Sequence, residues 1–326
     1  MRRRTALLLA LAAAVMASGC GNDDRAAANP GPWHGGRIFL ATGNTTGVYY
    51  QLGGGYADII SRYLPGYEAR AEPTGASGEN ITRLVNGDME IAFSLADTAA
   101  DATAGRGPFQ GRPQPVRSLA RVYSNFTHVI VTTSAKAGIK TMADLKDKRV
   151  STGSPGSGTD ALAGRLLTAA GLDPDRGVKR VKLSLPETTK QLRAGTLDAM
   201  FFSGGLPTPG ITDLLSAAPG KFALLPIADL MEPLNATYGP VYTTAELPQS
   251  AYNTPKGIPT ITVANLMLVS ADMPEQLAYD LTSLLFSHQT ELGAVHPEGR
   301  NFTKQSAAGT DPIPLHPGAA RYYRNG

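Results

Sequence analysis

Short apolar runs alternate with helical patterns along most of the chain. The first series has the order strand, helix, strand, helix, strand, and its segments are 38–42, 49–63, 67–73, 79–86 and 91–95. Strands that alternate with helices favour a largely parallel sheet covered by helices. The chain therefore begins with an α/β unit.

The same order begins again after residue 140. The second series consists of segments 149–152, 159–170, 181–185, 187–194 and 199–203. Its glycines keep a similar spacing, because Gly43 and Gly87 are 44 positions apart and Gly153 and Gly195 are 42 apart. We expect two similar α/β lobes, although any two α/β units share this alternation of helix, glycine and strand.

Two long apolar segments, 119–133 and 258–270, separate these patterns. Both are longer than an average strand. Long apolar segments of this kind are expected where the chain crosses from one lobe to the other and back. Two such crossings form a hinge, and a ligand cleft lies between the lobes that it joins. The tail after Pro274 has a helical pattern through His288, and we expect it to pack on the first lobe.

The first 19 residues have the composition of an export signal. Three arginines precede an apolar run, 6–17, that is too short for a stable membrane span. Residues 17–20 resemble a bacterial lipobox with Ala17 in place of its usual leucine, which implies cleavage before Cys20 and a lipid on its sulfur. The alternative is a plain signal peptide with an incidental cysteine. Residues up to 36 have the composition of a flexible tether.

Removal of the signal changes the charge balance. The chain has 30 Lys and Arg against 27 Asp and Glu, and Arg2, Arg3 and Arg4 lie in the signal. The mature chain is then neutral, and nucleic-acid binding loses its main support. Cys20 is the single cysteine, and the five histidines form no HExxH motif. The sequence therefore predicts no disulfide within the chain, no metal site and no cofactor.

Each half has a Gly/Ser/Thr-rich loop between its first strand and its first helix, at 43–50 and 153–160. Such loops expose backbone N–H groups at a helix N-terminus, where the partial positive charge favours an anion. Two such loops across a cleft would bind a carboxylate without an arginine; ordinary helix capping is the alternative. The candidate ligand contacts in these loops are Asn44, Thr45, Gly47, Tyr49, Ser157, Gly158 and Thr159.

A third loop, 73–80, precedes the next helix, with Ser77 as its expected N-cap. Asn80 would then point from the first turn toward the cleft and offer both a donor and an acceptor. Asp97 follows the third strand, where it would accept from a ligand ammonium group or cap the residues after it. Phe202, like Tyr49, is a candidate wall of the cleft, although such aromatic residues more often pack in a core.

Signatures of enzymes are missing from the chain. Residues 154–159 resemble a phosphate-binding loop but lack the lysine that follows its last glycine. No serine stands in a G-x-S-x-G or S-x-x-K arrangement. We expect a binding protein and not an enzyme, while the sequence leaves acid–base catalysis by dispersed carboxylates open.

Taken together, these segments resemble the TAXI family of TRAP-transporter-associated solute receptors, from about residue 38 to the C-terminus. The segments that carry the resemblance are 42–50, 74–80, 92–99, 153–159, 198–202 and 315–319. Membership implies a type II periplasmic-binding-protein fold. It also implies delivery of a small carboxylate, such as glutamate, glutamine or a dicarboxylate, to a TRAP-type membrane permease. Thr46, Gln51 and Gly78 depart from the family pattern.

The expected organisation has five parts: a signal peptide (1–19), a lipidated flexible tether (20–36), lobe 1 (37–130), lobe 2 (131–260), and a return to lobe 1 with C-terminal helices (261–326). The expected protein is lipid-anchored and faces the periplasm or the cell exterior. The expected function is reception of a solute for a membrane transporter. The alternative is a ligand-sensing subunit of the same fold that signals to a membrane kinase.

Overall fold

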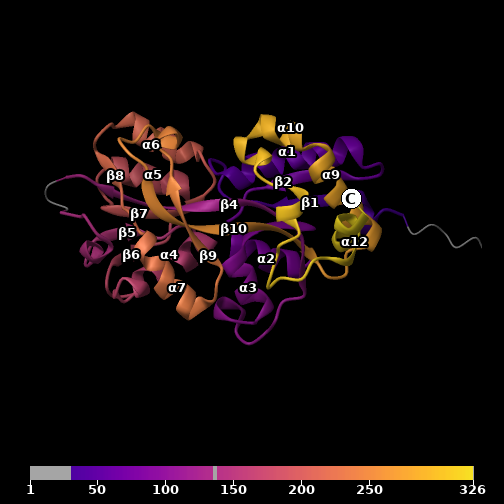
Figure 1. Cartoon of the computed structure of the whole chain (residues 1–326), viewed down its shortest axis with the longest axis horizontal. Coiled ribbons are helices and arrows are strands. Elements are labelled where there is room, and N and C mark those ends of the chain that lie inside the picture. Colours follow the sequence, from indigo (N-terminus) through magenta and orange to yellow (C-terminus); the bar gives the residue numbers. More distant parts are fainter. Residues whose placement is uncertain (1–30, 135–137, 326) are drawn as a thin grey trace, which may run out of the picture. The chain divides into compact units, whose positions relative to one another are not determined.

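The computed structural model describes residues 31–134 and 138–325 (Figure 1). The predicted signal peptide, Cys20 and most of the predicted tether therefore lie outside the described residues. The last four residues of that tether form a short 3-10 helix, η1 (Trp33–Gly36). The Trp33 N–H donates to the Tyr67 hydroxyl at 3.0 Å, and the His34 ring lies 2.8 Å from a carboxylate oxygen of Glu90. This short stretch is thus attached to the folded unit.

The first predicted series is confirmed. Its elements are β1 (Arg37–Ala41), α1 (Val48–Tyr63), β2 (Glu68–Glu72), α2 (Ser77–Val85) and β3 (Ile91–Leu95). β3 is buried along its whole length because helices cover the sheet. A helix that the sequence did not predict, α3 (Ala96–Thr103), follows β3 directly.

The second series is confirmed with one correction. Its elements are β5 (Arg149–Ser151), α4 (Gly158–Ala169), β6 (Lys179–Val181), α5 (Leu185–Arg193) and β7 (Ala199–Gly204). The strand predicted at 181–185 overlaps the observed β6 only at Val181, and its last residue, Leu185, is the first residue of α5. Ser184 caps that helix by accepting from the Glu187 N–H, and Pro186 lies in its first turn, where a proline is favourable.

Further elements complete the chain between and after these series. They are η2 (Gly107–Phe109), β4 (Val116–Thr132), η3 (Met142–Leu145), α6 (Pro209–Ala217), β8 (Phe222–Leu224), η4 (Ala228–Leu230), α7 (Met231–Tyr238), β9 (Tyr242–Leu247), α8 (Gln249–Tyr252), β10 (Ile258–Ser270), α9 (Glu275–Ser287), α10 (Gln289–Val295), η5 (Pro297–Arg300), α11 (Lys304–Ala307) and α12 (Pro317–Asn325).

The strands of Pro32–Gly326 form one sheet whose two ends have the same internal order. The order is β2-β1-β3-β10-β4-β7-β5-β6, with β8 beside β4 and β9 beside β10. β1, β2 and β3 pair in parallel, and so do β5, β6 and β7. Each parallel set adjoins one long antiparallel strand, β10 or β4. This repeated arrangement matches the two similar α/β halves expected from the sequence.

The two long strands belong to both halves, as predicted for crossing segments. Residues 116–126 of β4 pair with β10, whereas residues 126–131 pair with β7. Residues 265–269 of β10 pair with β3, whereas residues 258–263 pair with β9. Figure 1 shows β4 and β10 running side by side between the two groups of elements. The fold is therefore the two-lobed α/β fold with a hinge of two crossing strands.

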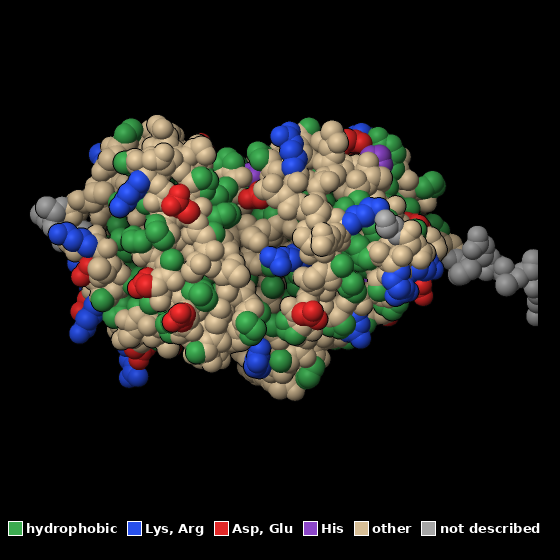
Figure 2. All heavy atoms as spheres, in the orientation of Figure 1, with side chains coloured by type: hydrophobic (Ala, Val, Ile, Leu, Met, Phe, Trp, Pro, Cys, Tyr) green, Lys and Arg blue, Asp and Glu red, His purple; other side chains and the backbone are tan. Residues whose placement is uncertain are grey.

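The C-terminal helices pack on the first half, as expected. Buried side chains of α9 and α12, including Leu281 and Ala319, share one apolar cluster with Leu40 of β1 and Ile60 of α1. Basic and acidic side chains are interspersed on the face drawn in Figure 2. Each helix within residues 31–134 and 138–325 is too short or too polar to cross a membrane. No cluster of three or more potential metal-ligating side chains occurs in that same part of the chain.

Candidate functional site

A cavity of about 40 Å³ lies where loops of both halves meet. Four predicted ligand residues of the first half line it: Asn44, Gly47, Tyr49 and Ser77. Four predicted residues of the second half line it as well: Ser157, Gly158, Thr159 and Phe202. The two Gly/Ser/Thr-rich loops therefore share one crevice.

The loops also contact each other directly. The Asn44 side-chain oxygen accepts from the Leu185 N–H at 3.2 Å and from the Ser154 hydroxyl at 3.4 Å. Outside the set of residues that line the cavity, the N–H groups of Gly78 and Glu79 both donate to the Gly156 carbonyl, at 3.1 and 3.3 Å. These contacts bring the first turns of helices from both halves to the cavity wall.

Four helices begin at the cavity. The first residues of α1, α2, α4 and α5 all line it: Val48, Ser77, Gly158 and Leu185. The amides of a first helical turn have no acceptor within the helix, and the helix dipole places positive potential there. Each such end stabilises an anion by roughly 0.3–1 kcal/mol at a surface and by up to about 2 kcal/mol when partly buried. The dipoles of all four favour a negatively charged ligand, whereas the Leu185 N–H of α5 and the Gly78 and Glu79 N–H groups of α2 already donate to protein oxygens.

Two buried hydroxyl groups at the cavity have no hydrogen-bond partner, those of Tyr123 and Ser203. Tyr123 is 2% exposed and Ser203 is 7% exposed. Burial raises the pKa of Tyr123 well above its usual value, so its phenol stays protonated and remains a donor. Because buried polar groups are nearly always paired, these two hydroxyls are suited to bind a polar ligand.

Two further hydroxyls are partly committed to the protein. The Ser157 hydroxyl oxygen caps α4 by accepting from the Asp160 N–H at 2.9 Å. The Thr159 hydroxyl oxygen accepts from the Ser203 N–H at 3.2 Å. Each of these hydroxyls still has a hydrogen to donate, so the second half offers several donors to the cavity.

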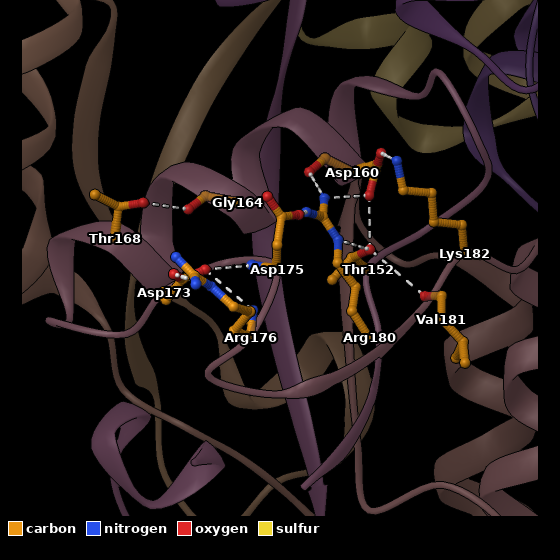
Figure 3. Close-up of polar contacts among 10 residues, drawn as sticks. All are labelled: Thr152, Asp160, Gly164, Thr168, Asp173, Asp175, Arg176, Arg180, Val181 and Lys182. Carbon is orange, nitrogen blue, oxygen red and sulfur yellow. Dashed lines mark hydrogen bonds and ion pairs between the residues drawn. The ribbon is translucent and has the colours of Figure 1, made fainter. Parts of the chain in front are cut away.

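No charged side chain lines the cavity among the residues that the structure describes. Asp160 lies in the first turn of α4, but its carboxylate is neutralised by partners that Figure 3 shows around it. It accepts from Arg180 at 2.5 Å and from the Thr152 hydroxyl at 2.6 Å, and Lys182 lies 2.9 Å away. The α4 N-terminus therefore keeps its positive potential despite an acidic residue beside it.

A buried amide network joins the cavity to the crossing strands. The Tyr49 hydroxyl donates to the side-chain oxygen of Asn265 on β10 at 2.5 Å. The Asn265 amide donates to the side-chain oxygen of Asn125 on β4 at 2.7 Å. Asn125 in turn donates to the carbonyl of Ser203 on β7 at 3.0 Å. Cavity residues from both halves are thus fixed relative to the hinge.

Three predicted ligand residues do not line the cavity: Thr45, Asn80 and Asp97. Asn80 instead ties strand ends together. Its amide nitrogen donates to the carbonyls of Thr42 at 2.7 Å and Phe93 at 2.8 Å, and its oxygen accepts from the Thr74 hydroxyl at 2.5 Å. With these partners made, Asn80 has little capacity left for a ligand.

The predicted capping role of Ser77 is also corrected. Ala76 is the N-cap of α2 and has the left-handed φ of 77°, while Ser77 is already the first helical residue. The Ser77 hydroxyl oxygen accepts from the Leu95 N–H at 3.1 Å. This contact holds the start of α2 against the end of β3 at the cavity wall.

Asp97 takes part in a buried ionic cluster. It accepts from the Thr98 N–H at 2.6 Å and from the Tyr242 hydroxyl at 2.7 Å, and Arg165 of α4 lies 3.3 Å away. Arg165 also pairs with Asp101. Burial alone would lower the pKa of Arg165, but the neighbouring acidic groups raise it, so it stays charged. The carboxylate of Asp97 therefore joins α3 to α4.

Sequence reasoning missed the cavity residues on the crossing strand. Tyr123 and Asn125 lie on β4, within the predicted apolar segment 119–133. An asparagine inside a buried apolar strand is costly unless it is paired, and this signal could have identified Asn125 and its counterpart Asn265 on β10. The missed signal for Leu185 was the serine and proline around it, which start a helix.

Similar proteins share the fold at low sequence identity. A binding protein of an ABC phosphonate transporter from Pseudomonas aeruginosa is 12% identical with a TM-score of 0.55, over 80% of this chain and 78% of that one. A protein from Bordetella bronchiseptica is 16% identical with a TM-score of 0.54, over 86% and 83%. The alkanesulfonate-binding protein SsuA from Xanthomonas axonopodis pv. citri is 16% identical with a TM-score of 0.50, over 90% and 84%.

These likenesses establish the periplasmic-binding-protein type of fold. The sequence itself gives the family, because residues 40–325 match one family over nearly all of the described chain. The chain belongs to the NMT1-like family.

Proposed function

We propose that the protein is an extracytoplasmic receptor that captures a small carboxylate in the cavity and delivers it to a TRAP-type membrane permease. The observation that carries the proposal is the convergence of four helix N-termini on two unpartnered buried hydroxyls. This arrangement suits an anion and needs no arginine. The resemblance to TAXI receptors supplies the ligand class, which is a glutamate- or glutamine-like amino acid or a dicarboxylate.

Two neighbours of the same fold support an anionic ligand by their names, which refer to alkanesulfonate and phosphonate. In the proposal, this chain takes a carboxylate in the corresponding place. Binding is favoured over catalysis, since the lining residues in the described part of the chain include no carboxylate, imidazole or thiol. Export, a lipid on Cys20 and lobes divided near residues 130 and 260 belong to the same proposal.

A ligand screen on the purified full-length chain tests the proposal. Amino acids, dicarboxylates, alkanesulfonates and phosphonates are added separately, and thermal unfolding and calorimetric titration are recorded. A true ligand at a hundred times its Kd adds about 2.7 kcal/mol to the free energy of unfolding. Stabilisation by sulfonates or phosphonates alone would refute the carboxylate class, and stabilisation by no anion would refute the receptor.

Two variants connect binding to the cavity. Tyr123→Phe and Ser203→Ala each remove one donor to a charged ligand, which is worth roughly 1.5–3 kcal/mol or about 10- to 140-fold in Kd. Ser118→Ala is the matched control, because Ser118 is also buried on β4 but does not line the cavity. Equal affinity of all three variants for the ligand would show that the ligand does not bind in this cavity.

The transporter part of the proposal needs a membrane assay. Uptake of the labelled ligand into vesicles that contain the permease should require the full-length chain and an ion gradient. Ligand-dependent kinase activity without uptake would instead support the sensing alternative.

A further inference from the structure

We propose that a groove on the second half binds an extended peptide segment, which adds to β8 as a further strand and ends in a carboxylate. The groove has a volume of about 800 Å³, whereas the cavity between the halves has about 40 Å³, and the two share no lining residue. Pockets that bind small ligands usually have roughly 300–1,000 Å³. Elements α6 and β8 line the groove together with residues 250–256, and Figure 1 shows α6 and β8 far from α12. The proposal is therefore independent of the solute that the cavity binds.

One edge of β8 presents backbone groups that no described residue pairs with. The ladder of β8 is with β4, on the opposite edge. The Leu225 N–H donates to β4 at 2.9 Å, and the Lys221 carbonyl accepts from the residue after β4 at 3.0 Å. Because the direction of these groups alternates along a strand, Phe222 and Leu224 turn their N–H and carbonyl groups to the other edge. No hydrogen bond within residues 31–134 and 138–325 uses these four groups.

The strand β10 does not cover this edge. Its residues 258–263 pair with β9, and within the described chain it forms no ladder with β8. The segment that leads into β10 lines the same groove as all three residues of β8. An extended peptide in the groove can therefore pair with β8, in the way that peptides add to an exposed sheet edge. Two donors and two acceptors of β8 are available to it.

The walls of the groove suit apolar side chains at alternate positions of such a peptide. Five half-buried apolar residues line it and pack against one apolar cluster: Leu215, Phe222, Leu224, Ala251 and Ile258. Phe222 and Leu224 lie on the same face of β8, because side chains alternate along a strand. The side chains of an added strand alternate in the same way, so every second one lies over this apolar surface.

Lys256 supplies the single charge of the groove. Among the described residues that line the groove, no other side chain is charged. Lys256 is exposed and takes part in none of the ion pairs within residues 31–134 and 138–325. One cation in an uncharged groove is complementary to one carboxylate, which the C-terminus of a peptide provides. A fatty acid also has one carboxylate, but its acyl chain cannot use the backbone groups of β8.

Peptide titrations of the full-length chain test the proposal. The probes are fluorescent peptides of about six residues, the usual length of a strand, with valine, leucine or phenylalanine at every second position and a free C-terminus. We expect saturable binding with a Kd below about 1 mM for members of this set, and weakening by about tenfold when their C-terminus is amidated. Binding of decanoate without binding of any peptide, or of neither, would overturn the proposal.

Methylation of backbone nitrogens tests the strand pairing itself. Only every second N–H of an edge strand faces its partner. Methylating one alternate set of nitrogens in the tightest peptide should abolish binding, whereas methylating the other set should preserve it. Equal effects of the two sets would overturn the addition of a strand.

Two pairs of variants place the peptide in the groove. Ser216→Trp fills the groove from an exposed position of α6 and should weaken binding by at least tenfold; Ala217→Trp is the control, since Ala217 is exposed but does not line the groove. Lys256→Met should weaken the free acid as much as amidation does and leave the amide unaffected, whereas Lys179→Met, exposed on β6, should change neither. Parent affinity in Ser216→Trp would overturn the proposed site, and parent affinity in Lys256→Met would overturn the assignment of the carboxylate.

Discussion

The contact between the loops before α2 and α4 gives a quantitative prediction for Gly78. A methyl carbon built at this position would lie 2.6 Å from the Gly156 carbonyl oxygen, and contacts below 3.0 Å are essentially never found. The two backbones would have to separate by at least 0.4 Å to reach 3.0 Å. Along the bond, this movement lengthens the Gly78 N–H to Gly156 carbonyl distance from 3.1 Å to about 3.5 Å, where the bond is essentially broken.

We expect the two halves to close on the ligand through this contact, so Gly78→Ala should weaken ligand binding and leave a folded protein whose halves are further apart. Two backbone hydrogen bonds to the Gly156 carbonyl are at risk, those of Gly78 and Glu79. At 0.5–1.5 kcal/mol each, their loss amounts to roughly 1–3 kcal/mol, or about 5- to 140-fold in Kd. When the loops move apart the alanine meets no clash, and replacing a helical glycine by alanine stabilises a helix by roughly 0.5–1 kcal/mol.

Calorimetric titration with the tightest acid of the screen measures this effect, alongside thermal unfolding of the unliganded protein. Gly54→Ala is the matched control, because Gly54 is also helical and a methyl carbon there meets nothing within 4 Å. The control should keep the parent Kd. A Gly78→Ala variant that binds as tightly as the parent would refute the reasoning that these loops must touch when the ligand is held.

Three further outcomes follow from buried groups. Arg165→Met leaves two buried aspartates without their cation and should lower the free energy of unfolding by roughly 3 kcal/mol or more in urea titrations; an unchanged midpoint would contradict this. Burial lowers the pKa of His128 from 6.5 to about 4, so the unfolded chain takes up a proton first as pH falls. Between pH 6.5 and 4 the free energy of unfolding of the parent should therefore fall by up to roughly 3 kcal/mol more than that of His128→Asn. Equal pH dependence of the two unfolding free energies would argue against this. The double variant Ser157→Ala with Thr159→Ala should weaken binding and also lower the melting temperature. It removes a helix cap worth about 1 kcal/mol and a buried partner of the Ser203 N–H. Unchanged affinity in this variant would show that the loop before α4 does not contact the ligand.

The sequence by itself determined the elements and their succession. Buried strands such as Ile91–Leu95 and the crossing strand Ile258–Ser270 are apolar runs bounded by turn residues, and this local signal needs no tertiary information. The loops 43–50 and 153–160 could be predicted as helix starts for the same reason. The strand predicted at 181–185 failed because Ser184 and Pro186 start a helix there, and these local signals were given less weight than the apolar run.

The tertiary structure alone decided which polar groups face one another. Asp97 follows a strand end, as a ligand residue would, but Arg165 and Tyr242 lie 68 and 145 positions away in the chain and take its carboxylate out of the cavity. In the sequence, Tyr123 is one aromatic residue within a long apolar strand. In the folded protein it lines the cavity at which four helices begin. Hydrophobic periodicity is a property of neighbouring positions, whereas charge pairing and cavity lining depend on contacts between distant ones, and this is why the fold could be predicted further than the site.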